Sequence, residues 1–138
     1  MVEMDPKVIM IVDDNDFQRR IVGTILEDEG YEPVYAASGT EALQAVQSIL
    51  PRLILLDFQM PDMNGTDVLG HLKADPRLAP VPVIMVSGSG EKEVILATCK
   101  LGAVDFIVKP FNRNTLITKI ARVIDAPPAA IETQPQTL

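Results

Sequence analysis

The sequence predicts an α/β fold in which one parallel sheet is covered by helices on both faces. Two observations carry this prediction. Apolar, β-branched runs of strand length alternate five times with amphipathic stretches of helix length. The strand-like runs are apolar at nearly every position, as expected of strands that are buried on both faces. We therefore expect a doubly wound (βα)5 sandwich with right-handed crossovers.

The first strand–helix unit shows both patterns clearly. Residues 7–12 read Lys-Val-Ile-Met-Ile-Val and are apolar after the first position, which predicts a buried strand. Apolar side chains then recur at helical spacing and predict an amphipathic helix, whose buried stripe consists of Phe17, Ile21, Ile25 and Leu26. Gly30 marks the end of this helix.

The next unit consists of a short strand at 34–37 and a capped helix. Ser38 is a predicted helix N-cap, because Glu41 stands three residues later as in a capping box. Pro51 is expected to end this helix, since a proline disfavours helical backbone in the residue before it. Residues 53–56, Leu-Ile-Leu-Leu, then form the third buried strand.

The second half of the chain continues the same alternation. The expected order is a loop at 60–65, a short helix ending near Asp75, a strand at 82–86, a loop at 87–90, a helix from about 91 to 101, a strand at 105–108 and a final helix with an apolar stripe over 116–124. Nothing periodic follows residue 125. A chain of 138 residues suffices for one hydrophobic core, so we expect one domain at 1–125 and a flexible tail or linker at 126–138.

Charge and cysteine content exclude several classes of function. The 19 acidic and 12 basic side chains give a net charge of −7, which argues against direct binding to nucleic acid, because phosphates attract basic surfaces. The single cysteine, Cys99, excludes an intramolecular disulfide and a thiolate zinc site. No apolar run reaches the roughly eighteen residues of a membrane helix, and no leader pattern opens the chain. We therefore expect a cytoplasmic protein that does not bind membranes.

Reactive polar residues follow four of the predicted strands. Asp13 and Asp14 follow the first strand, Asp57 the third, Ser87 the fourth and Lys109 the fifth. Ligands of open parallel sheets bind at this carboxyl edge, where the strand order reverses. In the flavodoxin-like order 2-1-3-4-5, which periodicity cannot establish and which we assume, the first and third strands are neighbours about 4.8 Å apart. The three carboxylates then converge.

A cluster of three carboxylates has clear chemical consequences. The carboxylates repel one another unless one is protonated or a cation lies among them. Carboxylate and water oxygens suit Mg²⁺ better than a soft metal. The ammonium group of Lys109 and the hydroxyl of Ser87 would complete a site for a phosphoryl group. Asp57 would then be placed to act as a nucleophile that forms an acyl phosphate.

The same residues resemble the receiver domain of bacterial response regulators, including the single-domain chemotaxis regulators. The resemblance extends from about residue 7 to residue 124 and rests on Asp13-Asp14, on Asp57 with Met60-Pro61-Asp62-Met63-Asn64-Gly65, on Ser87 and on Lys109-Pro110-Phe111. Any one acidic pair is a weak signal, whereas five features in the right order, each at a strand end, are a specific one.

The resemblance implies a role for each residue of the site. Asp57 would accept a phosphoryl group from a phosphohistidine on a sensor histidine kinase or a phosphotransfer protein. Mg²⁺ would be bound by the side chains of Asp14 and Asp57, by Asp13 directly or through water, and by the backbone carbonyl of Gln59. Lys109 would contact a phosphoryl oxygen.

The resemblance also implies how the signal leaves the site. Ser87 would move toward the phosphoryl group, and Phe106, which stands where many receivers have tyrosine, would turn inward behind it. The peptide bond between Lys109 and Pro110 would be cis. The surface of the fourth helix, fifth strand and fifth helix would control a downstream effector protein or a missing output domain, or form a phosphorylation-dependent dimer. Such a chain is a regulatory switch and not an enzyme, apart from assisting its own phosphorylation and slow autodephosphorylation.

Three other functions would use a similar fold or site. An aspartyl-nucleophile phosphatase needs a second acid two residues after the nucleophile, where this chain has Gln59. A flavodoxin-like electron carrier needs a phosphate-binding loop after the first strand, where Asp13-Asp14-Asn15-Asp16 would repel the flavin phosphate. A degenerate receiver would act only as a scaffold, but the acceptor and metal residues are all present.

Overall fold

Five strands alternate with five helices in the part of the chain that the structure describes. The computed structural model describes residues 3–88 and 92–125, so the segment at 126–138, for which a tail or linker is expected, lies outside the described residues. The elements are β1 (Met4–Val12), α1 (Asp16–Asp28), β2 (Glu32–Ala36), α2 (Gly39–Ala45), β3 (Leu50–Asp57), α3 (Gly65–Ala74), β4 (Val83–Ser87), α4 (Lys92–Lys100), β5 (Asp105–Val108) and α5 (Arg113–Asp125).

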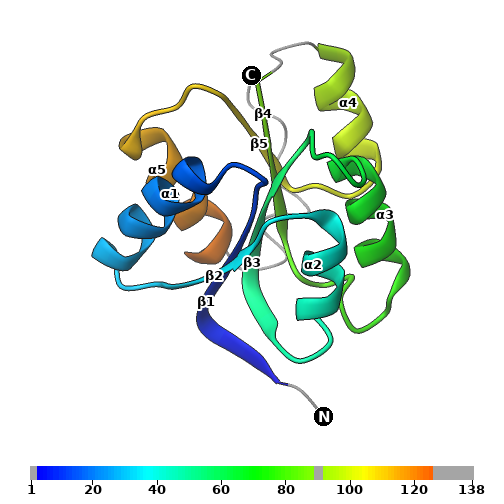
Figure 1. The fold of residues 1–138 in the computed structure, drawn as a ribbon, viewed down its shortest axis with the longest axis horizontal. Helices are drawn as coiled ribbons and strands as arrows, with labels where there is room; N and C mark the ends of the chain where they lie inside the picture. The colour runs from blue at the N-terminus through cyan, green and yellow to red at the C-terminus, as the bar shows by residue number, and fades with distance from the viewer. Residues whose placement is uncertain (1–2, 89–91, 126–138) are drawn as a thin grey trace.

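The five strands form one parallel sheet in the order β2-β1-β3-β4-β5, which confirms the predicted fold class and strand order. Helices α1 and α5 cover one face of the sheet, and α2, α3 and α4 cover the other (Figure 1). None of the helices within residues 3–88 and 92–125 is both long and apolar enough to cross a membrane.

Each face of the sheet has its own hydrophobic core, and β3 shows why. Leu53 and Leu55 belong to the core under α1 and α5, whereas Ile54 and Leu56 belong to the core under α2, α3 and α4. All four side chains are at most 3% exposed. Since successive side chains of a strand point to opposite faces, a strand covered on both sides is apolar at every position, as the sequence pattern predicts.

The buried stripe of α1 differs from the predicted one. Phe17 is 73% exposed and Ile21 is 40% exposed, so the prediction is wrong for both, and Val22 and Gly23 are buried instead. The reason lies in β2, whose Tyr35 ring packs onto α1 where Gly23 has no side chain. A Cβ at Gly23 would lie 2.0 Å from the Tyr35 hydroxyl oxygen. This close approach helps to set which face α1 turns toward the sheet.

Helix α2 is shorter than predicted, and Pro51 does not end it. Ser38 caps the helix as expected, because its hydroxyl oxygen accepts a hydrogen bond of 3.1 Å from the Glu41 backbone N–H. The helix nevertheless ends at Ala45, and Pro51 lies within β3. Strand β4 pairs with β3 only from Ile54 onward, so Pro51 has a neighbouring strand on one side only. The pairing of β1 with β3 also shifts register between Asp5 and Ile9, directly after the pair of Asp5 with Pro51, and prolines within sheets are tolerated near strand starts and bulges.

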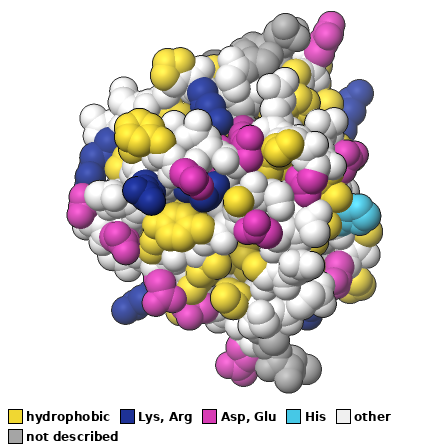
Figure 2. Space-filling view, in the orientation of Figure 1, with side chains coloured by type: hydrophobic (Ala, Val, Ile, Leu, Met, Phe, Trp, Pro, Cys, Tyr) yellow, Lys and Arg dark blue, Asp and Glu magenta, His cyan; other side chains and the backbone are white. Residues whose placement is uncertain are grey.

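The surface carries charges of both signs. Figure 2 shows Asp and Glu side chains spread over one face among Lys and Arg side chains, with separate apolar side chains between them. On this face the acidic side chains are therefore spread out and do not form one large acidic patch.

Candidate functional site

Three carboxylates meet at the carboxyl end of the two central strands. Asp13 and Asp14 directly follow β1, and Asp57 ends β3, whose Leu56 pairs with Val12 of β1. Because the register holds the two strand ends level, carboxylate oxygens of the three aspartates lie within 4.8 Å of one another. Asp13 and Asp57 are buried, and Asp14 is exposed. The structure thus brings together the three acids that the sequence singles out.

Lys109 reaches this cluster from the end of β5. Its Nζ lies 3.1 Å from Oδ1 of Asp57 and 3.5 Å from Oδ2 of Asp13. The backbone N–H of Lys109 donates a hydrogen bond of 2.7 Å to the carbonyl of Ser87, which ties the end of β5 to the end of β4. The peptide bond between Lys109 and Pro110 is cis, the isomer that the resemblance implies.

The electrostatics of the cluster leave it short of positive charge. The pKa of Asp57 is raised to about 6: burial is the main cause, Lys109 opposes the rise, and the neighbouring carboxylates of Asp13 and Asp14 add to it. Three carboxylates therefore face one ammonium group, and two of the three have little contact with water. A divalent cation with oxygen ligands would relieve this repulsion, and the donor set, made only of carboxylate oxygens, fits Mg²⁺.

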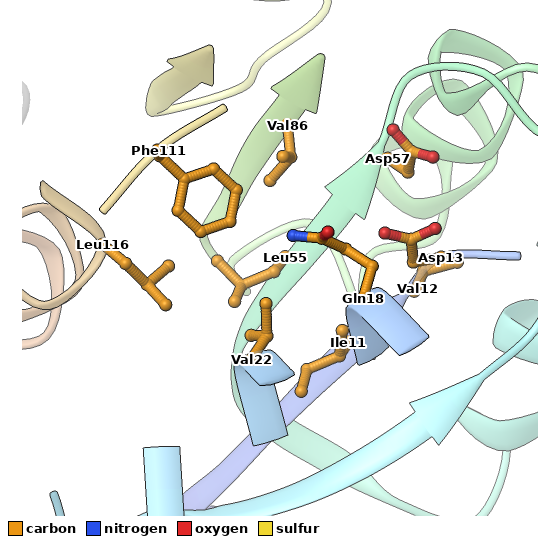
Figure 3. A pocket seen from close by; sticks show the side chains of 10 residues that line it. All are labelled: Ile11, Val12, Asp13, Gln18, Val22, Leu55, Asp57, Val86, Phe111 and Leu116. Carbon is orange, nitrogen blue, oxygen red and sulfur yellow. The ribbon is translucent and has the colours of Figure 1, made fainter. Parts of the chain in front are cut away.

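A cavity of about 20 Å³, with room for roughly one water molecule, lies beside the cluster on the α1 and α5 side. Figure 3 shows the amide of Gln18 pointing into it beside Asp13 and below Asp57, with Phe111 on the opposite wall. Gln18 is not among the site residues predicted from the sequence. The signal that could have found it is its spacing of four residues before Val22, which places both on the inner face of α1.

The other predicted site residues lie at the same edge of the sheet. Ser87 ends β4 and is 2% exposed. Phe106 is 8% exposed and already packs in the core under α2, α3 and α4. Gln59 is exposed and lies two residues after Asp57.

The loop after Asp57 returns to contact the residue from which it starts. The backbone N–H of Gly65 donates a hydrogen bond of 2.7 Å to the carbonyl of Phe58. A Cβ at Gly65 would lie 2.4 Å from the backbone oxygen of Asp57, so only glycine allows this approach. Closure at Gly65 therefore limits the positions open to the loop that carries Gln59.

Comparison with known proteins gives a consistent result. A family model described as response regulator receiver domain matches residues 9–121. The DNA-binding response regulators MtrA of Mycobacterium leprae and Mycobacterium bovis are each 34% identical to this chain over 112 residues, which cover 81% of this chain and 48% of theirs. The chain thus spans about half the length of the curated relatives it matches.

Solved structures show the same similarity over nearly their whole length. The chemotaxis protein CheY4 of Vibrio cholerae is 32% identical with a TM-score of 0.81, and the match covers 84% of this chain and 97% of CheY4. A CheY-like receiver domain protein of Methanospirillum hungatei is also 32% identical, with a TM-score of 0.81 and coverage of 94% and 98%. A putative response regulator of Chloroflexus aurantiacus is 29% identical, with a TM-score of 0.84 and coverage of 88% and 100%.

Proposed function

The chain belongs to the response regulator receiver domain family, and from this membership we propose that it is the phospho-accepting switch of a two-component phosphorelay. Asp57 takes a phosphoryl group from a phosphohistidine on a sensor histidine kinase or a phosphotransfer protein. The observation that carries the proposal is the grouping of Asp57 with Asp13, Asp14 and Lys109 at one end of the sheet.

The chemistry follows from the groups around Asp57. A carboxylate oxygen of Asp57 attacks the phosphorus atom, the P–N bond of the phosphohistidine breaks, and the imidazole nitrogen keeps the electron pair. Lys109, which is 3.1 Å from Asp57, is placed to follow the negative charge onto a phosphoryl oxygen. The hydroxyl of Ser87 donates to a second phosphoryl oxygen. Asp14, Asp57, Asp13 and the carbonyl of Gln59 would hold Mg²⁺, which supplies charge neutralisation.

The response to phosphorylation passes through Ser87 and Phe106 to the surface of α4, β5 and α5. Phosphorylation shifts an existing equilibrium between two conformations of this surface. Ser87 would move toward the phosphoryl group, and Phe106, which is 8% exposed, would pack inward behind it. This surface then controls an effector protein or an output domain, or pairs with a second copy of the chain.

Other features of the proposal concern the chain as a whole. Receiver domains are regulatory, and we propose that this one catalyses nothing beyond its own phosphorylation and slow autodephosphorylation. We also propose that residues 1–125 form the receiver domain and that residues 126–138 form a linker or tail. The protein is proposed to work in the cytoplasm. The receiver domain itself is proposed not to contact nucleic acid.

The direct test is phosphorylation by a small-molecule donor. The full chain is incubated with Mg²⁺ and acetyl phosphate and examined by mass spectrometry, and the wild type should gain the mass of one phosphoryl group. The Asp57→Ala variant should gain none, and omission of Mg²⁺ should greatly reduce the gain in the wild type. No gain in the wild type, or an equal gain in Asp57→Ala, would refute the proposal.

A further inference from the structure

The loop between β3 and α3 is fastened to α2 by a side chain outside the carboxylate cluster. Oδ1 of Asp62 accepts a hydrogen bond of 3.1 Å from the backbone N–H of Gly39. Oδ2 of Asp62 accepts one of 2.9 Å from the backbone N–H of Thr40 and one of 2.7 Å from the Thr40 hydroxyl. One carboxylate therefore receives three hydrogen bonds from the first turn of α2.

These hydrogen bonds favour the ionised form of Asp62. The Thr40 hydroxyl and backbone bonds lower the pKa of the Asp62 carboxyl to about 2, although the group is exposed. Burial does not hold this carboxylate in place. Its position follows from the donors of α2, so the contact is a specific link between two segments that are 22 or 23 residues apart in the chain.

A second contact holds the same two segments together. The side chain of Met63 lies directly over Gly39, and a Cβ at Gly39 would lie 2.3 Å from Cγ of Met63. The absence of a side chain at Gly39 thus admits Met63 against α2. The Asp62 bonds and the Met63 contact join neighbouring loop residues to the same turn of α2.

The fastened segment includes Gln59. One end of the loop is closed by the hydrogen bond from Gly65 to Phe58, and Asp62 fixes the far side. Between Gln59 and Asp62 lies Pro61, whose ring fixes one backbone angle and so limits the freedom of the chain between them. The side chain of Gln59 is exposed and does not itself anchor the backbone.

We propose that Asp62 is a positioning residue that sets the affinity of the site for Mg²⁺ by holding the Gln59 carbonyl in its ligating position. This inference rests on the proposed function, in which that carbonyl is a metal ligand. Groups that orient metal ligands typically change metal affinity by about 10- to 100-fold when they are removed. Because Gln59 would be one ligand of several and Met60 also anchors the loop in the core, we expect the lower end of this range.

The experiment measures Mg²⁺ affinity of the full chain by calorimetric titration, with the shift in melting temperature as a second readout. Asp62→Ala should weaken Mg²⁺ binding about 10-fold. Thr40→Val, which removes only the hydroxyl donor, should weaken it by a smaller factor, and Thr40→Ser, which keeps the hydroxyl, should bind Mg²⁺ like the wild type. The Thr40 pair also keeps the inference testable if Asp62→Ala does not fold.

Asp75→Ala is the matched control. Oδ1 of Asp75 accepts a hydrogen bond of 2.9 Å from the backbone N–H of Arg77 at the opposite end of α3, so its loss removes a similar contact far from the cluster. Asp75→Ala should leave Mg²⁺ affinity unchanged. An equal loss in Asp75→Ala and Asp62→Ala, or wild-type affinity in both Asp62→Ala and Thr40→Val, overturns the inference.

Asp14→Ala separates this inference from the proposed function. If the wild type binds Mg²⁺, Asp14→Ala does not, and Asp62→Ala binds like the wild type, then only the role of Asp62 is refuted. If the wild type shows no Mg²⁺ binding that depends on Asp14, the metal site itself is refuted, and the role of Asp62 is refuted with it.

Discussion

At the carboxyl end of the sheet three carboxylates share one ammonium group, whereas at the opposite end three cationic side chains donate to backbone carbonyls. Arg77 donates to the carbonyl of Val46 at 2.8 Å, at the end of α2, and Arg52 donates to the carbonyl of Ile124, near the end of α5. Lys73 donates to two carbonyls, those of Ala79 at 2.9 Å and Val81 at 3.0 Å.

The two ends differ in what their charges do for the folded state. A cation at a helix C-terminus meets the negative end of the helix dipole and satisfies carbonyls that the helix leaves open. Burial lowers the pKa of Lys73, so charge is costly at this end too, although its ammonium group donates two hydrogen bonds. At the carboxyl end burial raises the pKa of Asp57, Lys109 opposes the rise, and the carboxylates of Asp13 and Asp14 add to it. One end of the sheet therefore stabilises the fold, while the other retains unfavourable charge that a ligand can relieve.

The largest expected effect comes from removing the charge of Asp57. Its folded pKa of about 6 exceeds the ordinary value of 3.8, so the folded state binds the proton more tightly than the unfolded state. The stability of the metal-free wild type should therefore fall by up to about 3 kcal/mol as the pH rises from about 4 to about 7. Asp57→Asn should lack this loss and be more stable than the wild type at pH 7.5.

Urea denaturation in EDTA at several pH values measures this difference. The quantity to compare is the free energy of unfolding of Asp57→Asn minus that of the wild type, because other carboxylates titrate in both proteins. A difference that does not change between pH 4 and pH 7.5 would mean that the cluster carries no unfavourable charge, and the contrast between the two ends would disappear.

A somewhat smaller effect is expected when Mg²⁺ is added at neutral pH. A ligand that binds only the folded state stabilises it by about 2.7 kcal/mol at a concentration 100 times its Kd. The melting temperature of the wild type should rise with Mg²⁺, and Asp14→Ala should lose most of the rise because it removes a carboxylate of the cluster. Scanning calorimetry with and without EDTA measures both. An equal rise in Asp14→Ala would place the bound ion elsewhere.

The smallest effect is expected at the opposite end. Arg77→Met keeps the apolar stem but removes the hydrogen bond to Val46, which should lower the free energy of unfolding by about 1 kcal/mol. The loss in the free energy of unfolding is expected to be small because the variant also removes an unfavourable group. Within the described part of the chain, Nη1 of Arg77 is buried without a hydrogen-bond partner. Mg²⁺ affinity should not change. A changed affinity would show that the two ends are coupled.

The predictability of the fold differs between strands and helices. The run at 53–56 predicts its strand correctly because helices cover both faces of the sheet there. A strand buried on both faces is apolar at every position, and this pattern can be seen in the sequence alone. The buried stripe of α1 depends on Tyr35 packing against Gly23, and the end of α2 depends on where β3 begins. Such contacts join different elements, and local periodicity does not contain them.

The site shows the same division. The residues Asp13, Asp14 and Asp57 can be selected from the sequence because they follow apolar runs, but their convergence depends on the strand order, which periodicity cannot establish and which had to be assumed. Asp62 stands in the segment that carries the resemblance, yet its partners on α2 lie far away in the chain, so no local pattern points to its contacts.

The loop after Asp57 also bears on how such a protein can diverge. The path of its backbone depends on Gly65, where any side chain would collide with the peptide of Asp57, whereas the side chain of Gln59 extends from the same loop into solvent. Residue 59 can therefore be substituted in evolution without a change in the backbone. A substitution at residue 65 would force the backbone of this loop to move. Single substitutions at residue 59 can therefore change an exposed side chain two residues after Asp57, while the backbone path set by Gly65 is kept.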